Sequence, residues 1–223
     1  MSVDLTVERG MTDPELAEEF PALRLHLARV EAAARPRSPR SVKQRLRTMS
    51  DRYTGGKAVN LRQEPIPWAY RVFFRQIGID PDDRRTPAEE VALERMKWGG
   101  FRSVSLLDDA LTIATVETGV AVLALDSDRL EGDVGLRLST PGERLGVAPG
   151  DDPRGTRPLS SRQIVVADAA RSVAVLFGDT SEGRGVNPET ERMTLCGVQV
   201  KGVPEVSVEE ALWTVAAVLG EAG

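Results

Sequence analysis

The spacing of hydrophobic and polar residues changes in character about half-way along the chain. Up to residue 119, most apolar residues recur every three or four positions, as on one face of a helix. The exception is the stretch Leu23–Leu27, where leucines alternate with Arg24 and His26. This period of two predicts a strand with His26 on its wetter face. Helices are predicted over 12–20, 40–52, 65–77, 86–98, 104–117 and 207–219.

Beyond residue 120, the chain consists of short Val- and Leu-rich runs separated by Gly, Pro and Asp, which is typical of strands joined by turns. Strands are expected over 121–126, 133–139, 143–147, 163–169, 172–178 and 192–201, with a long loop over 149–162. Because strands and helices do not alternate regularly, we expect an α+β fold with helices packed on a mostly antiparallel or mixed sheet. Residues 1–223 are expected to form one domain.

The signals that start and stop helices are clearest around residues 86 to 100. Thr86 is a cap residue, Pro87 occupies the first helical position, and Glu89 is placed to complete a capping box. Gly99-Gly100 is expected to end this helix. Gly55-Gly56 is expected in the same way to end the helix predicted over 40–52. In that earlier helix a buried stripe is predicted from residues spaced four, three and four apart, namely Val42, Leu46, Met49 and Tyr53.

The composition excludes several classes of protein and site. Hydrophobic residues make up 41% and charged residues 28%, as in globular domains. No apolar run is long enough to span a membrane, and the first residues do not resemble a secretory signal, so we expect a cytoplasmic protein. One cysteine, Cys196, and one histidine, His26, supply neither a disulfide nor a His/Cys metal site. No cofactor or metal is expected.

Basic residues are concentrated between residues 35 and 57. This segment has eight basic side chains and one acidic side chain, although the whole chain has a net charge of −5. The cations of the helix that follows Pro39 lie off its apolar stripe and are predicted to bind RNA phosphates; they are Arg40, Lys43, Arg45 and Arg47. The alternative is a solvated face without a partner. Aromatic residues are 4% of the chain, which argues against a base-stacking platform, and neither DNA nor a membrane is an expected partner.

Several stretches resemble one known family when they are taken in order. Arg71–Pro87 is similar to that family's arginine, Ile-Gly-x-Asp-Pro, arginine, Thr-Pro sequence, and the helices over 89–99 and 103–119 continue the likeness. Residues 121–132 are similar to its aspartate and Leu-x-Gly turn, and Val134–Arg137 to its arginine-ending strand. The family is the B3/B4 editing domain of the phenylalanyl-tRNA synthetase beta subunit, in its free-standing form. The likeness covers roughly residues 10–205, and the helix over 207–219 follows it.

The resemblance implies hydrolysis of an amino acid wrongly attached to tRNA, and it also implies where the pocket lies. The family's pocket asparagine falls at or near Thr112, its histidine at Leu123, and its glutamate near Leu195 or Cys196. A pocket that has lost these polar groups cannot single out the hydroxyl of tyrosine, so a more apolar aminoacyl group is expected. Asp109 and Thr112 are the expected catalytic residues, and the expected substrate-binding residues are Leu123, Asp126, Arg137, Gly178 and Cys196.

Each of these residues also has a structural interpretation. Asp109 can cap its helix or pair with Arg137, Asp126 can be a turn residue, and Thr112 can bond its own backbone. Cys196 can be a small buried apolar residue. Arg84 and Arg85 can hold phosphate, or they can pair with the neighbouring acids Asp80, Asp82 and Asp83.

Two main functions follow from the sequence. The first is a trans-acting aminoacyl-tRNA ester hydrolase with an altered pocket. The second is a non-catalytic module that binds tRNA, an amino acid or an aminoacyl ester. A drifted copy with an interaction role only is a third possibility. The first of these functions makes the protein an enzyme and the other two do not, and the sequence is compatible with all three.

Overall fold

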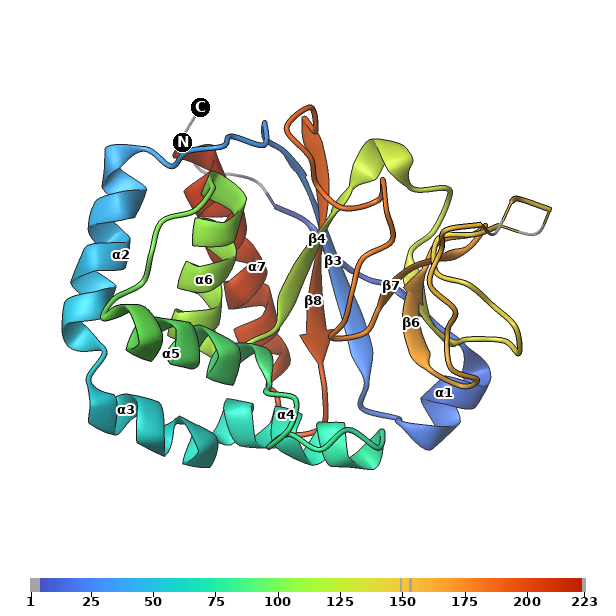
Figure 1. Ribbon diagram of the computed structural model, residues 1–223, viewed down its shortest axis with the longest axis horizontal. Helices are drawn as coiled ribbons and strands as arrows, with labels where there is room; N and C mark the ends of the chain where they lie inside the picture. Colours follow the sequence, from blue (N-terminus) through green and yellow to red (C-terminus); the bar gives the residue numbers. More distant parts are fainter. Residues whose placement is uncertain (1–4, 149, 153, 222–223) are drawn as a thin grey trace.

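Two four-stranded sheets form the centre of the protein in a computed structural model that describes residues 5–148, 150–152 and 154–221 (Figure 1). The first sheet is entirely antiparallel and has the order β1 (Val7–Arg9), β3 (Arg24–Glu31), β8 (Arg192–Gln199), β4 (Val122–Asp126). The second has the order β2 (Met11–Thr12), β5 (Gly135–Leu138), β6 (Ile164–Ala167), β7 (Ser172–Val175), and only β2 and β5 pair in parallel.

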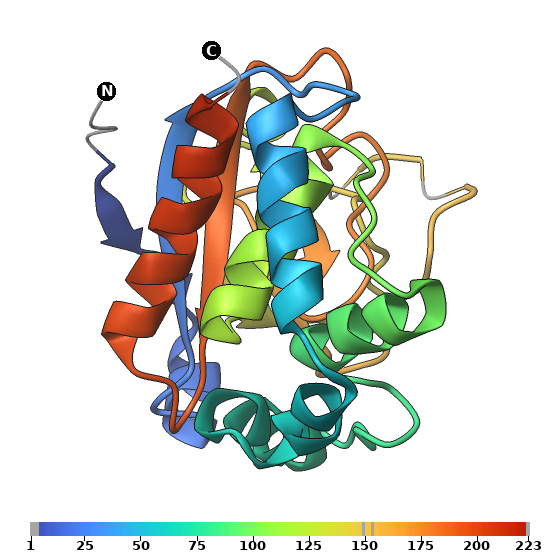
Figure 2. The same ribbon diagram turned by 90° about the vertical axis from the view of Figure 1, so that its left-hand side faces the viewer.

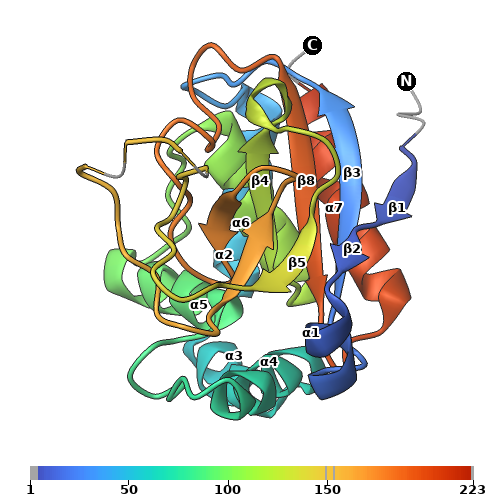
Figure 3. The same ribbon diagram turned by 90° about the vertical axis from the view of Figure 1, so that its right-hand side faces the viewer.

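Helices cover one side of the first sheet, and the second sheet lies on its other side (Figures 1 and 3). The two helices against the first sheet are α6 (Leu106–Thr118) and α7 (Glu205–Gly220). Helix α2 (Arg40–Arg52) forms a further layer outside α6, where it faces the viewer in Figure 2. The remaining helices are α1 (Pro14–Glu19), α3 (Gly55–Asn60), α4 (Pro65–Gln76) and α5 (Pro87–Trp98). The predicted α+β class, with helices on a mixed or antiparallel sheet, is confirmed.

The predicted start and stop signals of α5 and the apolar stripe of α2 also hold. Thr86 and Glu89 form both halves of a capping box at α5, and Gly99 ends that helix in the left-handed conformation with φ +73°. The stripe predicted for α2 faces the core, since Val42, Leu46 and Tyr53 are buried. This stripe fixes which side of α2 is left for solvent, and therefore where its cations lie.

The prediction for His26 was wrong. Its side chain is 1% exposed, and its Nε2 lies 2.9 Å from Gln199 Oε1. The alternation of leucines does mark β3, but this strand is covered on both faces, by α7 on one side and by the second sheet on the other. A half-buried strand has a wet face, whereas a strand in the middle of a layered domain has none.

Other differences concern short elements. Asp13, not Thr12, caps α1, because its side chain accepts from the N–H groups of Glu15 and Leu16. The prediction that Gly55-Gly56 ends the basic helix was wrong: α2 ends at Arg52, and the two glycines are the first residues of the short helix α3, which is capped by Thr54. Residues 143–147 form no strand, only a bridge between Arg144 and Pro158. Strands β1 and β2, and helix α3, were not predicted. In the predicted 149–162 loop, residues 149 and 153 lie outside the described residues.

A glycine on β8 allows α7 to approach the first sheet closely. A Cβ atom at Gly197 would lie 2.6 Å from Cγ1 of Val208 on α7. Gly197→Ala is therefore expected to lower the free energy of unfolding by about 1–3 kcal/mol, because the helix must move away from the sheet. Urea unfolding measures this loss. Gly185→Ala is the control, since its Cβ would meet no atom closer than 3.7 Å; equal losses in the two variants would contradict the explanation.

Candidate functional site

Leu123 and Cys196 form a cross-strand pair in the first sheet. They are register partners on β4 and β8. Because the neighbouring residue Gly197 faces α7, alternation along β8 directs Cys196, and with it Leu123, toward the second sheet. Cys196 is fully buried, Leu123 is half-buried, and both belong to or pack against the main core cluster. The pair therefore forms an apolar floor on this side of the sheet.

The Cys196 thiol is poorly suited to be a nucleophile. Burial raises its pKa to about 12, so the reactive thiolate is absent at neutral pH. This agrees with the interpretation of Cys196 as a small buried apolar residue. Cys196 is therefore a packing residue of the floor and is unsuited to attack a substrate.

Gly178 follows β7 and is linked to the same sheet through two aromatic rings. The ring of its neighbour Phe177 lies 5.7 Å from that of Tyr70. The Tyr70 hydroxyl donates to the backbone carbonyl of Val198 and accepts from the N–H of Ala121. These two backbone groups lie two positions from Cys196 and Leu123 respectively. The structure thus connects the Gly178 turn with one end of the floor.

Thr112 lies away from these three residues. It belongs to α6, which packs on the opposite side of the first sheet, and it lines a concavity of about 380 Å³ beside α5. Trp98, Arg95 and Val104 line the same concavity. The four positions expected around one pocket are therefore divided between the two sides of the sheet.

Asp109 is held at the start of α6 by hydrogen bonds from two loops. Its carboxylate accepts from the hydroxyls of Ser38 and Ser103, at 2.5 and 2.6 Å, and from the N–H of Val104 at 2.9 Å. The side chain is 1% exposed. The alternative that it pairs with Arg137 is wrong, since Arg137 pairs elsewhere. Asp109 in this arrangement ties the start of α2 to the loop before α6.

Asp126 has a similar environment at the end of β4. It accepts hydrogen bonds from Thr190 Oγ1 at 2.8 Å, Asn187 Nδ2 at 3.3 Å and the N–H of Asp128 at 3.0 Å. It is buried. These contacts fix the turn after β4 against the segment before β8, in keeping with a turn residue.

Arg137 on β5 forms a two-pronged ion pair with Glu143. The two guanidinium–carboxylate distances are 2.8 and 2.7 Å, and the N–H of Thr140 also donates to Glu143 at 2.8 Å. Burial acts to raise the pKa of Glu143, but these hydrogen bonds outweigh it and hold the pKa at about 2. The pair borders a concavity of about 420 Å³ that Arg144 and Arg171 also line.

The depressed pKa of Glu143 predicts how this pair responds to acid. A carboxyl whose pKa is lower in the folded state stabilises the protein above its unfolded value near 4.5, and this contribution disappears as the pH falls toward 2. Glu143→Gln should therefore be less stable than wild type at pH 7, and the difference should shrink between pH 5 and pH 2. Urea unfolding across this range is the measurement; a difference that grows in acid would contradict it.

The predicted RNA-binding residues of α2 fall into two groups. Arg45 forms a two-pronged ion pair with Glu117 of α6, with nitrogen–oxygen distances of 2.9 and 2.7 Å. Within the described chain, Arg40, Lys43 and Arg47 have neither an ion pair nor a side-chain hydrogen bond, and their spacing of three and four places them along one flank of the helix. We name these three residues the α2 cation row. Arg45 lies on the other flank.

The expected pairing of Arg84 and Arg85 with the adjacent acids was wrong. Arg84 donates to the backbone carbonyl of Phe177, and Asp82 pairs instead with Arg62 and Arg71. Acids next to each other in sequence are not necessarily the nearest partners once α4 and α5 fold against each other. The side chain of Arg84 thereby holds the turn at Gly178.

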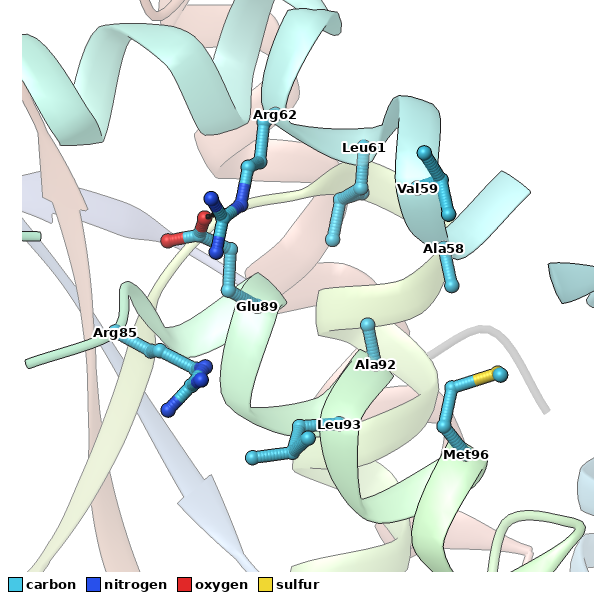
Figure 4. Close-up of a pocket in the computed structure, with 9 residues that line it drawn as sticks. All are labelled: Ala58, Val59, Leu61, Arg62, Arg85, Glu89, Ala92, Leu93 and Met96. Carbon is cyan, nitrogen blue, oxygen red and sulfur yellow. Dashed lines mark ion pairs between the residues drawn. The ribbon is translucent and has the colours of Figure 1, made fainter. Parts of the chain in front are cut away.

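A buried ion pair between α4 and α5 was not predicted. Arg71 Nη1 lies 2.7 Å from Glu89 Oε1, and both residues are nearly inaccessible. Arg62 also contacts Glu89 at 3.0 Å, at the end of a concavity of about 400 Å³ between α3 and α5 (Figure 4). Arg71 could have been noticed as a basic residue inside the apolar face of a helix.

Nearly half of the sequence is similar to one part of known proteins. The chain is 31% identical over 104 residues to the phenylalanine–tRNA ligase beta subunit of Photorhabdus laumondii. It resembles a part of that subunit. The matched residues are 46% of this chain and 12% of the relative. The subunits of Dickeya dadantii and Xanthomonas oryzae are 33% identical over 104 residues and 37% identical over 98 residues, again over 12% of each relative.

The likeness is therefore to a domain-sized piece of phenylalanine–tRNA ligase beta subunits, and the relatives are much longer than the chain. No family model matches the sequence. The described helices include none with the length and hydrophobicity needed to cross a membrane. The described residues also contain no group of three or more His, Cys, Asp or Glu side chains able to hold a metal ion.

Proposed function

We propose that this protein binds the aminoacylated end of a tRNA and hydrolyses the ester that joins the amino acid to it. The observation that carries the proposal is the 31–37% identity to phenylalanine–tRNA ligase beta subunits over nearly half of the chain. The B3/B4 likeness of the sequence gives the type of reaction. The α2 cation row supports the choice of an RNA ligand, because these cations have no acidic partner in the described structure.

The amino acid side chain is proposed to lie on the floor formed by Leu123 and Cys196. Both residues are apolar and face the second sheet, and the nearby turn at Gly178 contributes backbone groups. A site of this kind favours an apolar side chain, because discrimination for a phenolic hydroxyl requires polar groups that pair with it. We therefore propose an apolar aminoacyl group as the substrate class.

The proposed reaction uses water as the nucleophile. Water adds to the ester carbonyl carbon, the bond from that carbon to the ribose oxygen breaks, and the ribose oxygen takes up a proton of the attacking water to become a hydroxyl as the free amino acid leaves. Backbone N–H groups can orient the water and the carbonyl oxygen. Asp109 is proposed to act as a positioning residue and not as the base, because its oxygens already accept three hydrogen bonds.

Deacylation of a panel of aminoacyl-tRNAs tests the proposal. Purified protein is expected to release at least one apolar amino acid faster than buffer does. Leu123→Asp, which places a charge on the floor, should abolish the acceleration for that amino acid while tRNA binding is retained. If no aminoacyl-tRNA in the panel is hydrolysed faster than in buffer, the hydrolase proposal is wrong.

The α2 cation row should carry much of the affinity for tRNA. Reversing it with Arg40→Glu, Lys43→Glu and Arg47→Glu is expected to weaken binding at least about tenfold and to flatten the dependence of affinity on salt, since phosphate contacts release counterions. Filter binding at several salt concentrations measures both. A charge-matched control is the triple reversal of Arg75, Arg129 and Lys201, which lie elsewhere on the surface. If both triple variants weaken tRNA binding equally, the α2 cation row is not a specific part of the tRNA-binding site.

One observation favours a second candidate, a module that binds aminoacyl-tRNA without hydrolysing it. The two carboxylates expected near the chemistry, Asp109 and Asp126, are buried and already hold several donors each. Neither is free to take a proton from water. Salt-dependent tRNA binding without any deacylation would support this second candidate over the first.

A further inference from the structure

The loop before α6 runs beside α2 and is attached to it at both ends. At one end, the Ser50 hydroxyl of α2 accepts from the N–H of Phe101 at 2.7 Å, and Arg95 donates to the Ser50 carbonyl at 3.1 Å. At the other end, Ser38 and Ser103 share the carboxylate of Asp109. Figure 2 shows this loop passing alongside α2. The loop and the helix thus form one continuous surface.

The α2 cation row lies on the side of the helix that meets this loop. Lys43, Arg47 and Ser50 are spaced four and three apart, so they share one flank of α2. Since Ser50 contacts Phe101, the cations of the row point along the edge of the loop, not toward the far side of the helix. Arg102, the next residue in the loop, adds an exposed cation that has no acidic partner in the described structure.

Beside this edge is the concavity of about 380 Å³ between α5 and α6. Trp98 lies at its rim with 46% of its surface exposed, and the guanidinium of Arg102 sits 3.7 Å from the centre of the Trp98 ring. Val104, which is 67% exposed, and Thr112 complete the apolar and hydroxyl parts of the lining. A large aromatic ring with a guanidinium stacked on it is thus accessible at the mouth of an open cavity.

The acids around the concavity limit what can enter it. Glu94 accepts a hydrogen bond from the Trp98 indole N–H at 2.6 Å and lies 3.6 Å from Lys97, whereas Glu90 is exposed at the edge. A phosphate inside would meet these carboxylates. A neutral base would not, and its amino groups can donate to them.

We propose that this concavity binds the base of an unpaired RNA nucleotide while the α2 cation row holds the adjoining phosphates. The base stacks on the Arg102 guanidinium, which the Trp98 ring supports from the other side, as bases stack on guanidinium and aromatic groups in single-stranded RNA sites. One such ring is enough for one base, which agrees with the scarcity of aromatic residues in the chain. The inference rests on the proposed function, because it takes the ligand to be RNA. It adds a second binding site, which lies on the helical side of the first sheet and away from the Leu123–Cys196 floor.

Binding of two short RNA probes separates base recognition from phosphate recognition. The probes are an oligoadenylate and a ribose-phosphate oligomer of equal length without bases. Trp98→Ala is expected to weaken binding of the oligoadenylate about tenfold and to leave binding of the abasic oligomer unchanged. The triple reversal of the α2 cation row should weaken both. Trp213→Ala, at an equally exposed tryptophan on α7, is the matched control and should change neither.

A second measurement guards against loss of structure in Trp98→Ala. With Trp68→Phe and Trp213→Phe, Trp98 is the sole tryptophan, and its fluorescence should be quenched by the oligoadenylate and much less by the abasic oligomer. Arg102→Ala should reduce that quenching. Unchanged fluorescence with oligoadenylate, or equal effects of Trp98→Ala on both probes, would overturn the inference.

These outcomes are independent of hydrolysis, because neither probe carries an amino acid. If no aminoacyl-tRNA is deacylated but the two probes behave as expected, the base site stands and the hydrolase proposal fails. If deacylation is found while Trp98→Ala changes neither the binding of the probes nor the apparent KM for aminoacyl-tRNA, this inference alone is wrong.

Discussion

Replacing Arg71 with methionine is expected to lower the free energy of unfolding by about 3 kcal/mol. Arg71 and Glu89 are only 4% and 5% exposed, and their side chains are 2.7 Å apart. Removing one member of a buried ion pair leaves the other as a poorly compensated charge, which is costly by about 3–5 kcal/mol. We expect the lower end of that range because Arg62 remains 3.0 Å from Glu89. Urea unfolding measures the loss.

Two further variants separate the buried pair from its exposed surroundings. Asp82→Asn removes the exposed carboxylate that also contacts Arg71, and it should cost far less than Arg71→Met, because water and salt screen this pair. The double variant Arg71→Met with Glu89→Gln should recover roughly half of the loss, because glutamine is neutral and can still accept from Thr86 in the capping box. If the double variant loses as much free energy of unfolding as Arg71→Met and Glu89→Gln lose together, an uncompensated charge on Glu89 is not the cause.

Replacing Asp109 with alanine is the second change expected to have a large effect. Three donors lose their acceptor, of which Ser38 is buried, and buried donors without a partner cost about 1–3 kcal/mol each. We expect a total loss of about 3 kcal/mol in the free energy of unfolding. We also expect weaker tRNA binding, because the start of α2 and the loop before α6 are no longer fixed to each other.

The neighbouring acid provides a matched control. Asp108 is exposed, and among the described residues its carboxylate accepts a side-chain hydrogen bond from Ser105 alone, so Asp108→Ala should cost about 1 kcal/mol or less. Asp109→Ala should also show faster hydrogen exchange at Val104. If Asp109→Ala keeps its full stability and tRNA affinity but loses deacylation, Asp109 is a catalytic group and its proposed positioning role is wrong.

The sequence predicted the fold better than it predicted the arrangement of side chains. The capping box at Thr86 and the stripe led by Val42 and Leu46 are local features, determined by spacing within one helix, and the structure confirms them. The burial of His26 depends on two layers that come from distant parts of the chain. Alternation along β3 carries no information about whether a second layer covers the polar face.

In the candidate site too, contacts that follow from strand pairing were predicted, whereas contacts that depend on how helices pack were not. Leu123 and Cys196 come together because register in a sheet follows from pairing, and the resemblance aligned both strands. Thr112 was expected beside them, but a position on a helix does not reveal on which side of the sheet that helix packs. The pairing of Arg45 with Glu117 depends on how α2 packs against α6, and no spacing in the sequence specifies it.

The pairing of β3 with β8 at the centre of the first sheet also determines how the chain must fold. His26 and Gln199, whose side chains meet across these strands, are 173 positions apart. Closing so long a loop costs chain entropy before any strand contact compensates for it, so we expect the pairing of β3 with β8 to form slowly and late in folding. Until then β3 has only the short strand β1 as a partner, and its other edge is expected to stay unpaired while most of the chain is synthesised.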